Sequence, residues 1–158
     1  MNVGRIAAAI LVLAALIAGA ALWWLQTRAF YDPVAFAPGA EVLLTPAGGG
    51  NPVAIPVTGI TGIDAASSPI RFRACFSTPL PLAEIAAAYA PYPRAVPLTA
   101  PGWFGCFDAA AIGAALERGE ARAFLSQAAI RPDVDRVVAI LPDGRGFAWH
   151  QLAPGAAR

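Results

Sequence analysis

The stretch Ile6–Leu25, IAAAILVLAALIAGAALWWL, decides how the rest of the chain is organised. It contains twenty residues without a charged side chain or a proline. An α-helix of this length spans about 30 Å, the thickness of the hydrocarbon core of a bilayer. Because a helix satisfies its own backbone hydrogen bonds in lipid, the stretch predicts a transmembrane helix.

The residues around this stretch suggest its orientation. Trp23 and Trp24 close the apolar run, as aromatic side chains do at a membrane interface. Arg5 precedes the run and Arg28 follows it, so the side-chain charges alone favour neither orientation. The N-terminal amine adds to Arg5, and we therefore expect a cytoplasmic N-terminus and a single-pass inner-membrane protein.

A cleaved signal peptide is the main alternative to this anchor. Ala18-Gly19-Ala20 has the small-x-small pattern of a cleavage site. The apolar run continues beyond that site, however, and few charges precede it. A buried helix of a soluble protein fits less well. Both leading interpretations export the remainder of the chain to the periplasmic side.

Composition divides the chain into four parts. We expect a membrane anchor at 1–28, a connector at 29–40, an exported domain at 41–153 and a tail at 154–158. Residues 33–158 contain nine Arg and nine acidic residues. A domain with balanced charge has no basic surface for nucleic acid, so we expect no nucleic-acid partner.

Hydrophobic periodicity and turn residues predict an α+β domain. Its expected core is a mostly antiparallel sheet with two helices on one face. The segment Gly59–Pro69 is expected to be irregular. The expected strands are Glu41–Thr45, Val53–Thr58, Ile70–Phe76, Ala121–Gln127, Asp135–Leu141 and Phe147–Leu152, and the expected helices are Thr78–Tyr89 and Ala109–Arg118.

The chain has two cysteines, Cys75 and Cys106. In an exported domain, an even number of cysteines most simply indicates a disulfide. A thiol-redox pair is an alternative, although no C-x-x-C motif is present. A metal site would have only His150 to add to the two thiols and would lack a ligand. We expect no cofactor, no metal and no enzymatic activity.

Two other features suggest chemistry only weakly. Arg71 and Arg73 fall on the same side of one expected strand and could bind an anion. A solvated or carboxylate-paired face is the simpler interpretation. His150 is the sole histidine, and no nucleophile accompanies it in the sequence. We expect it to be packed in the domain or to lie at its rim.

The loop Pro91–Phe104 is the expected contact with a protein partner. Its prolines make it stiff, so it loses little conformational entropy on binding. Tyr92, Trp103 and Phe104 belong to residue types that are common at interfaces. Packing of Trp103 over the disulfide is the alternative.

Three segments carry a resemblance to a known family: SSPIRFRACFSTPL at 67–80, VPLTAPGWFGCFDAAAIGAALERGEARAFL at 96–125, and DRVVAILPDGRGFAWHQL at 135–152. They resemble an uncharacterised bacterial family of short, N-terminally anchored envelope proteins. The resemblance implies the architecture and assigns no site residues. We expect a binding module that serves as an accessory or assembly factor of an envelope complex. The alternatives are a thiol-redox factor or enzyme that uses Cys75 and Cys106, and a small-ligand binding domain.

Overall fold

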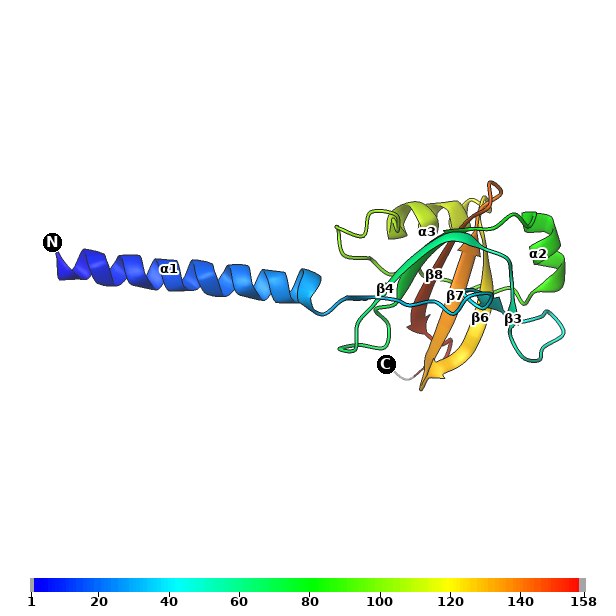
Figure 1. Ribbon diagram of the computed structural model, residues 1–158, viewed down its shortest axis with the longest axis horizontal. Helices are drawn as coiled ribbons and strands as arrows, with labels where there is room; N and C mark the ends of the chain where they lie inside the picture. The colour runs from blue at the N-terminus through cyan, green and yellow to red at the C-terminus, as the bar shows by residue number, and fades with distance from the viewer. Residues whose placement is uncertain (1, 157–158) are drawn as a thin grey trace. The chain divides into compact units, whose positions relative to one another are not determined.

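The computed structural model describes residues 2–156, and the chain divides into two compact units, Met1–Tyr31 and Asp32–Arg158 (Figure 1). The first unit is the helix α1 (Val3–Trp24), which continues into a π-helical turn, η1 (Leu25–Ala29). None of the side chains of α1 is buried. By its length and composition, the helical segment Val3–Ala29 could cross a membrane, as the sequence predicts.

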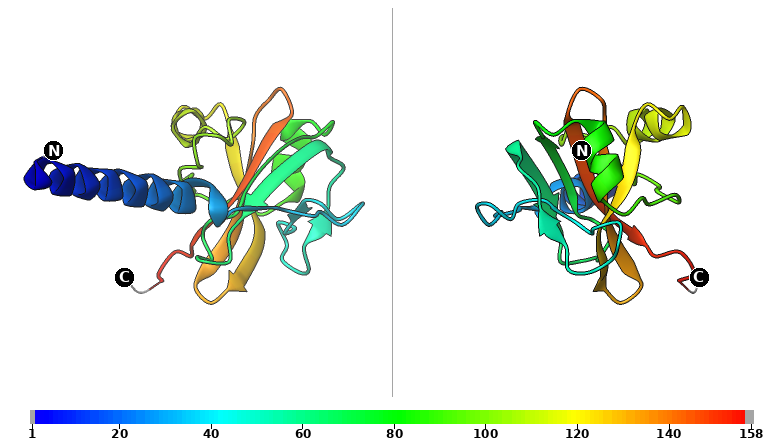
Figure 2. Two further views of the ribbon diagram at one scale, coloured as in Figure 1. Left: turned by 60° about the vertical axis from the view of Figure 1, so that its left-hand side comes forward. Right: turned by 90° about the vertical axis from the view of Figure 1, so that its right-hand side faces the viewer.

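The second unit is built on a six-stranded antiparallel sheet in the order β1-β4-β5-β8-β7-β6. A separate two-stranded pair and two short helices accompany this sheet (Figures 1 and 2). The sheet strands are β1 (Asp32–Pro33), β4 (Thr58–Asp64), β5 (Arg73–Ser77), β6 (Arg122–Arg131), β7 (Val134–Ile140) and β8 (Arg145–Leu152). The remaining elements are β2 (Leu43–Leu44), β3 (Val53–Ala54), α2 (Leu82–Ala88) and α3 (Ala109–Glu117).

The sheet separates two clusters of buried side chains. One contains Phe72, Ala74 and Ala148, and the other contains Cys75, Phe147 and Trp149. Because side chains alternate between the faces of a sheet along each strand, the clusters lie on opposite faces. We call the face of Phe72, Ala74 and Ala148 the first face, and the face of Cys75, Phe147 and Trp149 the second face.

Each face carries one of the helices. Helix α2 buries Ile85 in the cluster of the first face, and α3 buries Ile112 in the cluster of the second face. The α+β class is therefore confirmed, but the helices do not share one face as expected. Between them the chain passes the outer edge of the sheet, where Pro91 forms a bridge to Phe124 of β6.

The strand β4 occupies part of the segment that was expected to be irregular. Its sequence, TGITGID, contains two glycines, which weaken the signal for a strand. One of these glycines has a packing role, because a Cβ at Gly62 would lie 2.6 Å from the ring of Phe36. The expectation for Gly59–Pro69 was thus wrong over the stretch from Gly59 to Asp64.

Helix α3 begins at Ala109 as expected and ends at Glu117, one residue before the expected end. The Asp108 side chain accepts a hydrogen bond from the Ala111 amide at 3.0 Å and caps the N-terminus. At the other end, Gly119 has a φ of 71°, which a glycine adopts without a steric penalty. Helix α2 begins at Leu82, later than expected, and Pro81 is its N-cap residue. The Thr78 hydroxyl lies before the helix and donates to the Pro56 carbonyl at 2.9 Å.

Candidate functional site

A row of polar side chains crosses the first face near one end of the sheet. In the strand register Asp32 pairs with Asp64, His150 pairs with Arg136, and Arg136 pairs with Gln127. Residues that lie directly opposite each other on paired strands point to the same face. The register therefore places two carboxylates at the β1–β4 end of the row and an arginine at the β7–β6 end.

Phe72 lies within this row and supports its polar groups. Its ring stacks on that of His150, with 4.6 Å between the centroids. The guanidinium carbon of Arg136 lies 4.3 Å from the Phe72 centroid, an arrangement that favours a cation. The Phe72 ring thus holds the side chains of His150 and Arg136 in fixed positions.

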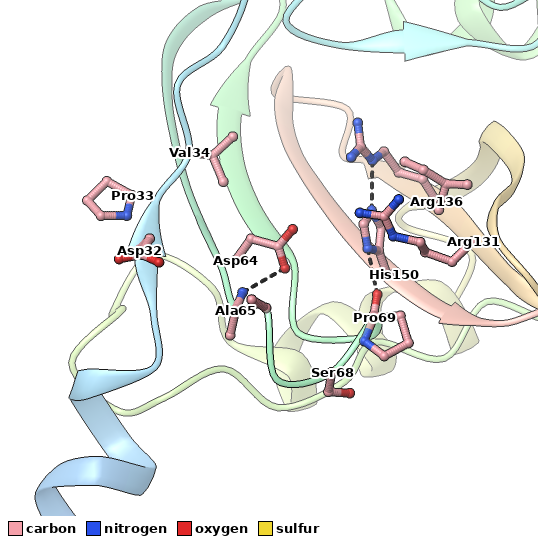
Figure 3. A pocket seen from close by; sticks show the side chains of 12 residues that line it. Asp32, Pro33, Val34, Asp64, Ala65, Ser68, Pro69, Arg131, Arg136 and His150 are labelled. Atoms are coloured by element: carbon pink, nitrogen blue, oxygen red, sulfur yellow. Dashed lines mark hydrogen bonds between the residues drawn. The ribbon is translucent and has the colours of Figure 1, made fainter.

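The hydrogen bonds of His150 define its protonation state (Figure 3). Arg136 Nε donates to His150 Nε2 at 3.0 Å, so Nε2 has to act as an acceptor. The Nδ1 atom lies 2.8 Å from the Pro69 carbonyl oxygen and donates its proton there. His150 is therefore a neutral imidazole with its proton on Nδ1.

The electrostatics of the row agree with this assignment. Burial, followed by the positive charge of Arg136, lowers the pKa of His150 to about 4. Burial also lowers the pKa of Arg136, while the more distant Asp64 raises it. Within residues 2–156, Arg136 has no carboxylate within the 4.0 Å of an ion pair. The Arg136 guanidinium contacts neutral groups, and it donates a hydrogen bond to Gln127 Oε1 at 3.4 Å.

A cavity of about 550 Å³ opens over this row. Asp32 and Asp64 line it from β1 and β4, and Arg131 and Arg136 line it from β6 and β7 (Figure 3). The arrangement can bind charged groups of either sign. His150 is not free to act as a general base in this arrangement, because both of its ring nitrogens are engaged in hydrogen bonds.

The loop predicted to contact a partner lies on the second face, and we call residues 91–104 the strap. Two side chains of the sheet hold it. Arg73, which is 4% exposed, donates to the carbonyls of Leu98 at 2.6 Å and Thr99 at 3.1 Å. Gln151 accepts from the Val96 amide at 2.8 Å and donates to the Arg94 carbonyl at 2.9 Å.

These contacts correct the interpretation of the two-arginine strand. Arg73 is on the expected face of the strand, but that face is covered by the strap. The guanidinium also donates to the carbonyls of Ile70 and Phe72, at 2.8 and 2.7 Å. It is thus buried and not solvated. It binds backbone carbonyls that would otherwise be buried without a donor.

The three predicted contact residues have different surroundings. Tyr92 is 7% exposed and donates from its hydroxyl to Asp135 at 2.9 Å, so it faces the core and not a partner. The Tyr92 amide donates to the Ala123 carbonyl of β6, and this pairing directs the side chain inward despite the flanking prolines. Trp103 is 38% exposed, and Phe104 is half-buried against the cluster of the second face.

Cys75 and Cys106 form a disulfide, with 6.3 Å between their Cα atoms. The bond joins the middle of β5 to the turn before α3. Cys75 is buried, whereas Cys106 is exposed. Within residues 2–156, no three His, Cys, Asp or Glu side chains are grouped so that they could hold a metal ion.

Comparison with known proteins identifies one relationship. The model described as "Family of unknown function (DUF6446)" matches residues 42–157. This match confirms the predicted resemblance to an uncharacterised family, while its bacterial and envelope character stays a prediction. No curated protein and no solved structure matches the chain.

Proposed function

We propose that this chain, which belongs to the family of unknown function just described, is a membrane-anchored binding module. In this proposal, α1 lies in the inner membrane and the domain lies on the periplasmic side, where it serves as an accessory or assembly factor of a protein complex. The apolar segment Val3–Ala29 supports the anchor. The Cys75–Cys106 disulfide supports export, because disulfides persist in oxidising compartments.

The strap is the observation that carries the binding role. Hydrogen bonds from Arg73, Gln151 and Tyr92 hold it against the second face, and the disulfide holds Cys106 just beyond its end. A surface that is already ordered pays little entropy when a partner docks. Its outward side presents Val96, which is 58% exposed, and Trp103.

The test is purification of the full chain from membranes in a gentle detergent, followed by identification of the proteins that remain bound. Val96→Asp places a charge on the outward side of the strap and keeps the backbone amide that donates to Gln151. Val53→Asp is the matched control, because Val53 is 49% exposed on β3, away from the strap. We expect Val96→Asp to lose a membrane protein that the wild type and Val53→Asp both retain.

The melting temperature of each variant shows whether the domain is folded. The proposal fails if folded Val96→Asp retains the same partners as the wild type. It also fails if the wild type carries no protein in a fixed ratio after purification.

A further inference from the structure

The charges that line the cavity on the first face are separated in space. Asp32 and Asp64 form its acidic wall, and Arg131 and Arg136 form its basic wall (Figure 3). The two walls balance to zero, since His150 is neutral. A monovalent ion of either sign would face two like-charged side chains as well as two opposite ones, whereas a ligand with both charges can match each wall.

The neighbours of these groups hold the walls apart. Asp64 accepts a hydrogen bond from the Ala65 amide at 2.8 Å, which ties its carboxylate to its own side of the cavity. Arg136 is tied to the other side by His150 and by the Phe72 ring. Opposite charges that are anchored separately stay available to a ligand that carries both charges.

We propose that this cavity binds a free aliphatic α-amino acid in its zwitterionic form. Its carboxylate would lie against Arg131 and Arg136, whose guanidinium groups suit a carboxylate, and its ammonium group would lie against Asp64 and Asp32. The volume of about 550 Å³ is ample for such a ligand.

The remaining lining of the cavity determines which amino acids fit. Val34, Ile130 and Pro33 contribute apolar surface beside the charged walls. An aliphatic side chain would bury apolar area there. This site lies on the face opposite the strap, so the inference goes beyond the proposed partner contact and can fail independently of it.

Isothermal titration calorimetry of the detergent-purified full chain tests the proposal. The probes are L-alanine, L-valine and L-leucine, together with two analogues of leucine that each lack one charge: 4-methylpentanoate lacks the ammonium group, and 3-methylbutylamine lacks the carboxylate. We expect at least one amino acid to bind with a Kd below about 1 mM. For leucine, we expect both analogues to bind at least about tenfold more weakly. The proposal is overturned if none of the amino acids binds, or if one analogue binds as well as leucine.

Two substitutions assign the binding to the walls. Arg131→Gln and Asp64→Asn should each weaken binding of the amino acid about tenfold or more, and Asp64→Asn should leave binding of 4-methylpentanoate unweakened. Asp64→Asn keeps an oxygen for the Ala65 amide, and Arg131 is exposed, so both variants should fold. Arg118→Gln and Asp143→Asn remove exposed charges that do not line the cavity and should bind like the wild type. Wild-type affinity in both wall variants would overturn the assignment.

Discussion

At the residue scale, His150 differs from a histidine in water in both its tautomer and its pKa. Arg136 Nε donates a hydrogen bond to His150 Nε2. If Nε2 took up a proton, two N–H donors would face each other and the imidazolium would lie beside the arginine charge. Protonation therefore has to break the Arg136 contact or place two positive charges together. This makes His150 a positioning residue for Arg136, in agreement with the expectation that the sole histidine is packed.

The first prediction concerns the pH dependence of stability. The pKa of His150 is about 4 in the folded chain, against an ordinary value of 6.5. The unfolded chain therefore takes up a proton at higher pH than the folded chain does. Stability should be highest above pH 6.5 and fall as the pH drops toward 4, by up to about 3 kcal/mol, with no further contribution from His150 below that pH.

Denaturant unfolding of the wild type and of His150→Gln between pH 7 and pH 4 measures this difference. The variant keeps a possible acceptor for Arg136 but does not titrate, so its stability should change less over this range. The single His150 resonance in an NMR titration gives the folded pKa directly. A pKa near 6.5, or equal slopes for the two proteins, would contradict the assignment.

The surroundings of single side chains were only partly accessible from the sequence. Alternation along Ile70–Phe76 correctly separated Phe72 from Arg73. It could not show that the strap covers the face of Arg73, because that contact joins residues 25 positions apart. The inward direction of the Tyr92 side chain was not foreseen for a related reason. It follows from the backbone hydrogen bond between Tyr92 and Ala123, which the local sequence pattern does not predict.

At the element scale, the second prediction tests the contact between β5 and β8. Gly146 pairs with Phe76, and a Cβ at position 146 would overlap the Phe76 ring. Gly146→Ala should therefore lower the unfolding free energy by about 1–3 kcal/mol. Gly113→Ala is the matched control, because a Cβ there would meet no atom within 4 Å and alanine favours the helix α3.

Chemical denaturation of the two variants gives the comparison. Gly113→Ala should be neutral or stabilising by up to about 1 kcal/mol. Equal stability changes in the two alanine variants would show that packing of Gly146 under Phe76 does not constrain the sheet.

The elements with a strong local signal were the ones predicted well. Strands β7 and β8 are rich in apolar residues and flank a Pro-Asp-Gly turn, so their pairing was foreseeable. Strand β4 was missed because its two glycines weaken the strand signal, and only the fold shows that Gly62 packs against Phe36. The position of α3 was also foreseeable from its cap, but the face that it covers depends on where the chain crosses the sheet edge.

At the scale of the whole molecule, the cavity required information that no local pattern contains. Asp32, Asp64 and the neighbouring pair Arg131 and Arg136 are far apart in the sequence, and they come together through the strand order β1-β4-β5-β8-β7-β6. The helix that could span a membrane, by contrast, was plain from a continuous apolar run. The sequence thus indicated the apolar helix, whereas the candidate ligand site follows only from the register of the sheet.

The central claim is that the apolar helix anchors a domain that lies outside the cytoplasm. Labelling with a membrane-impermeant maleimide tests it in intact spheroplasts, with one new cysteine on each side of α1. Ser67→Cys places a thiol in an exposed turn of the domain, and Asn2→Cys places one before the helix. The native cysteines are already oxidised to a disulfide and should not react.

We predict that Ser67→Cys is labelled in intact spheroplasts and that Asn2→Cys is labelled only after lysis. The chain found in the membrane fraction should still contain residue 2. Labelling of Asn2→Cys but not Ser67→Cys before lysis would reverse the orientation. Absence of residue 2 from the mature chain would show a cleaved signal peptide and contradict the anchor.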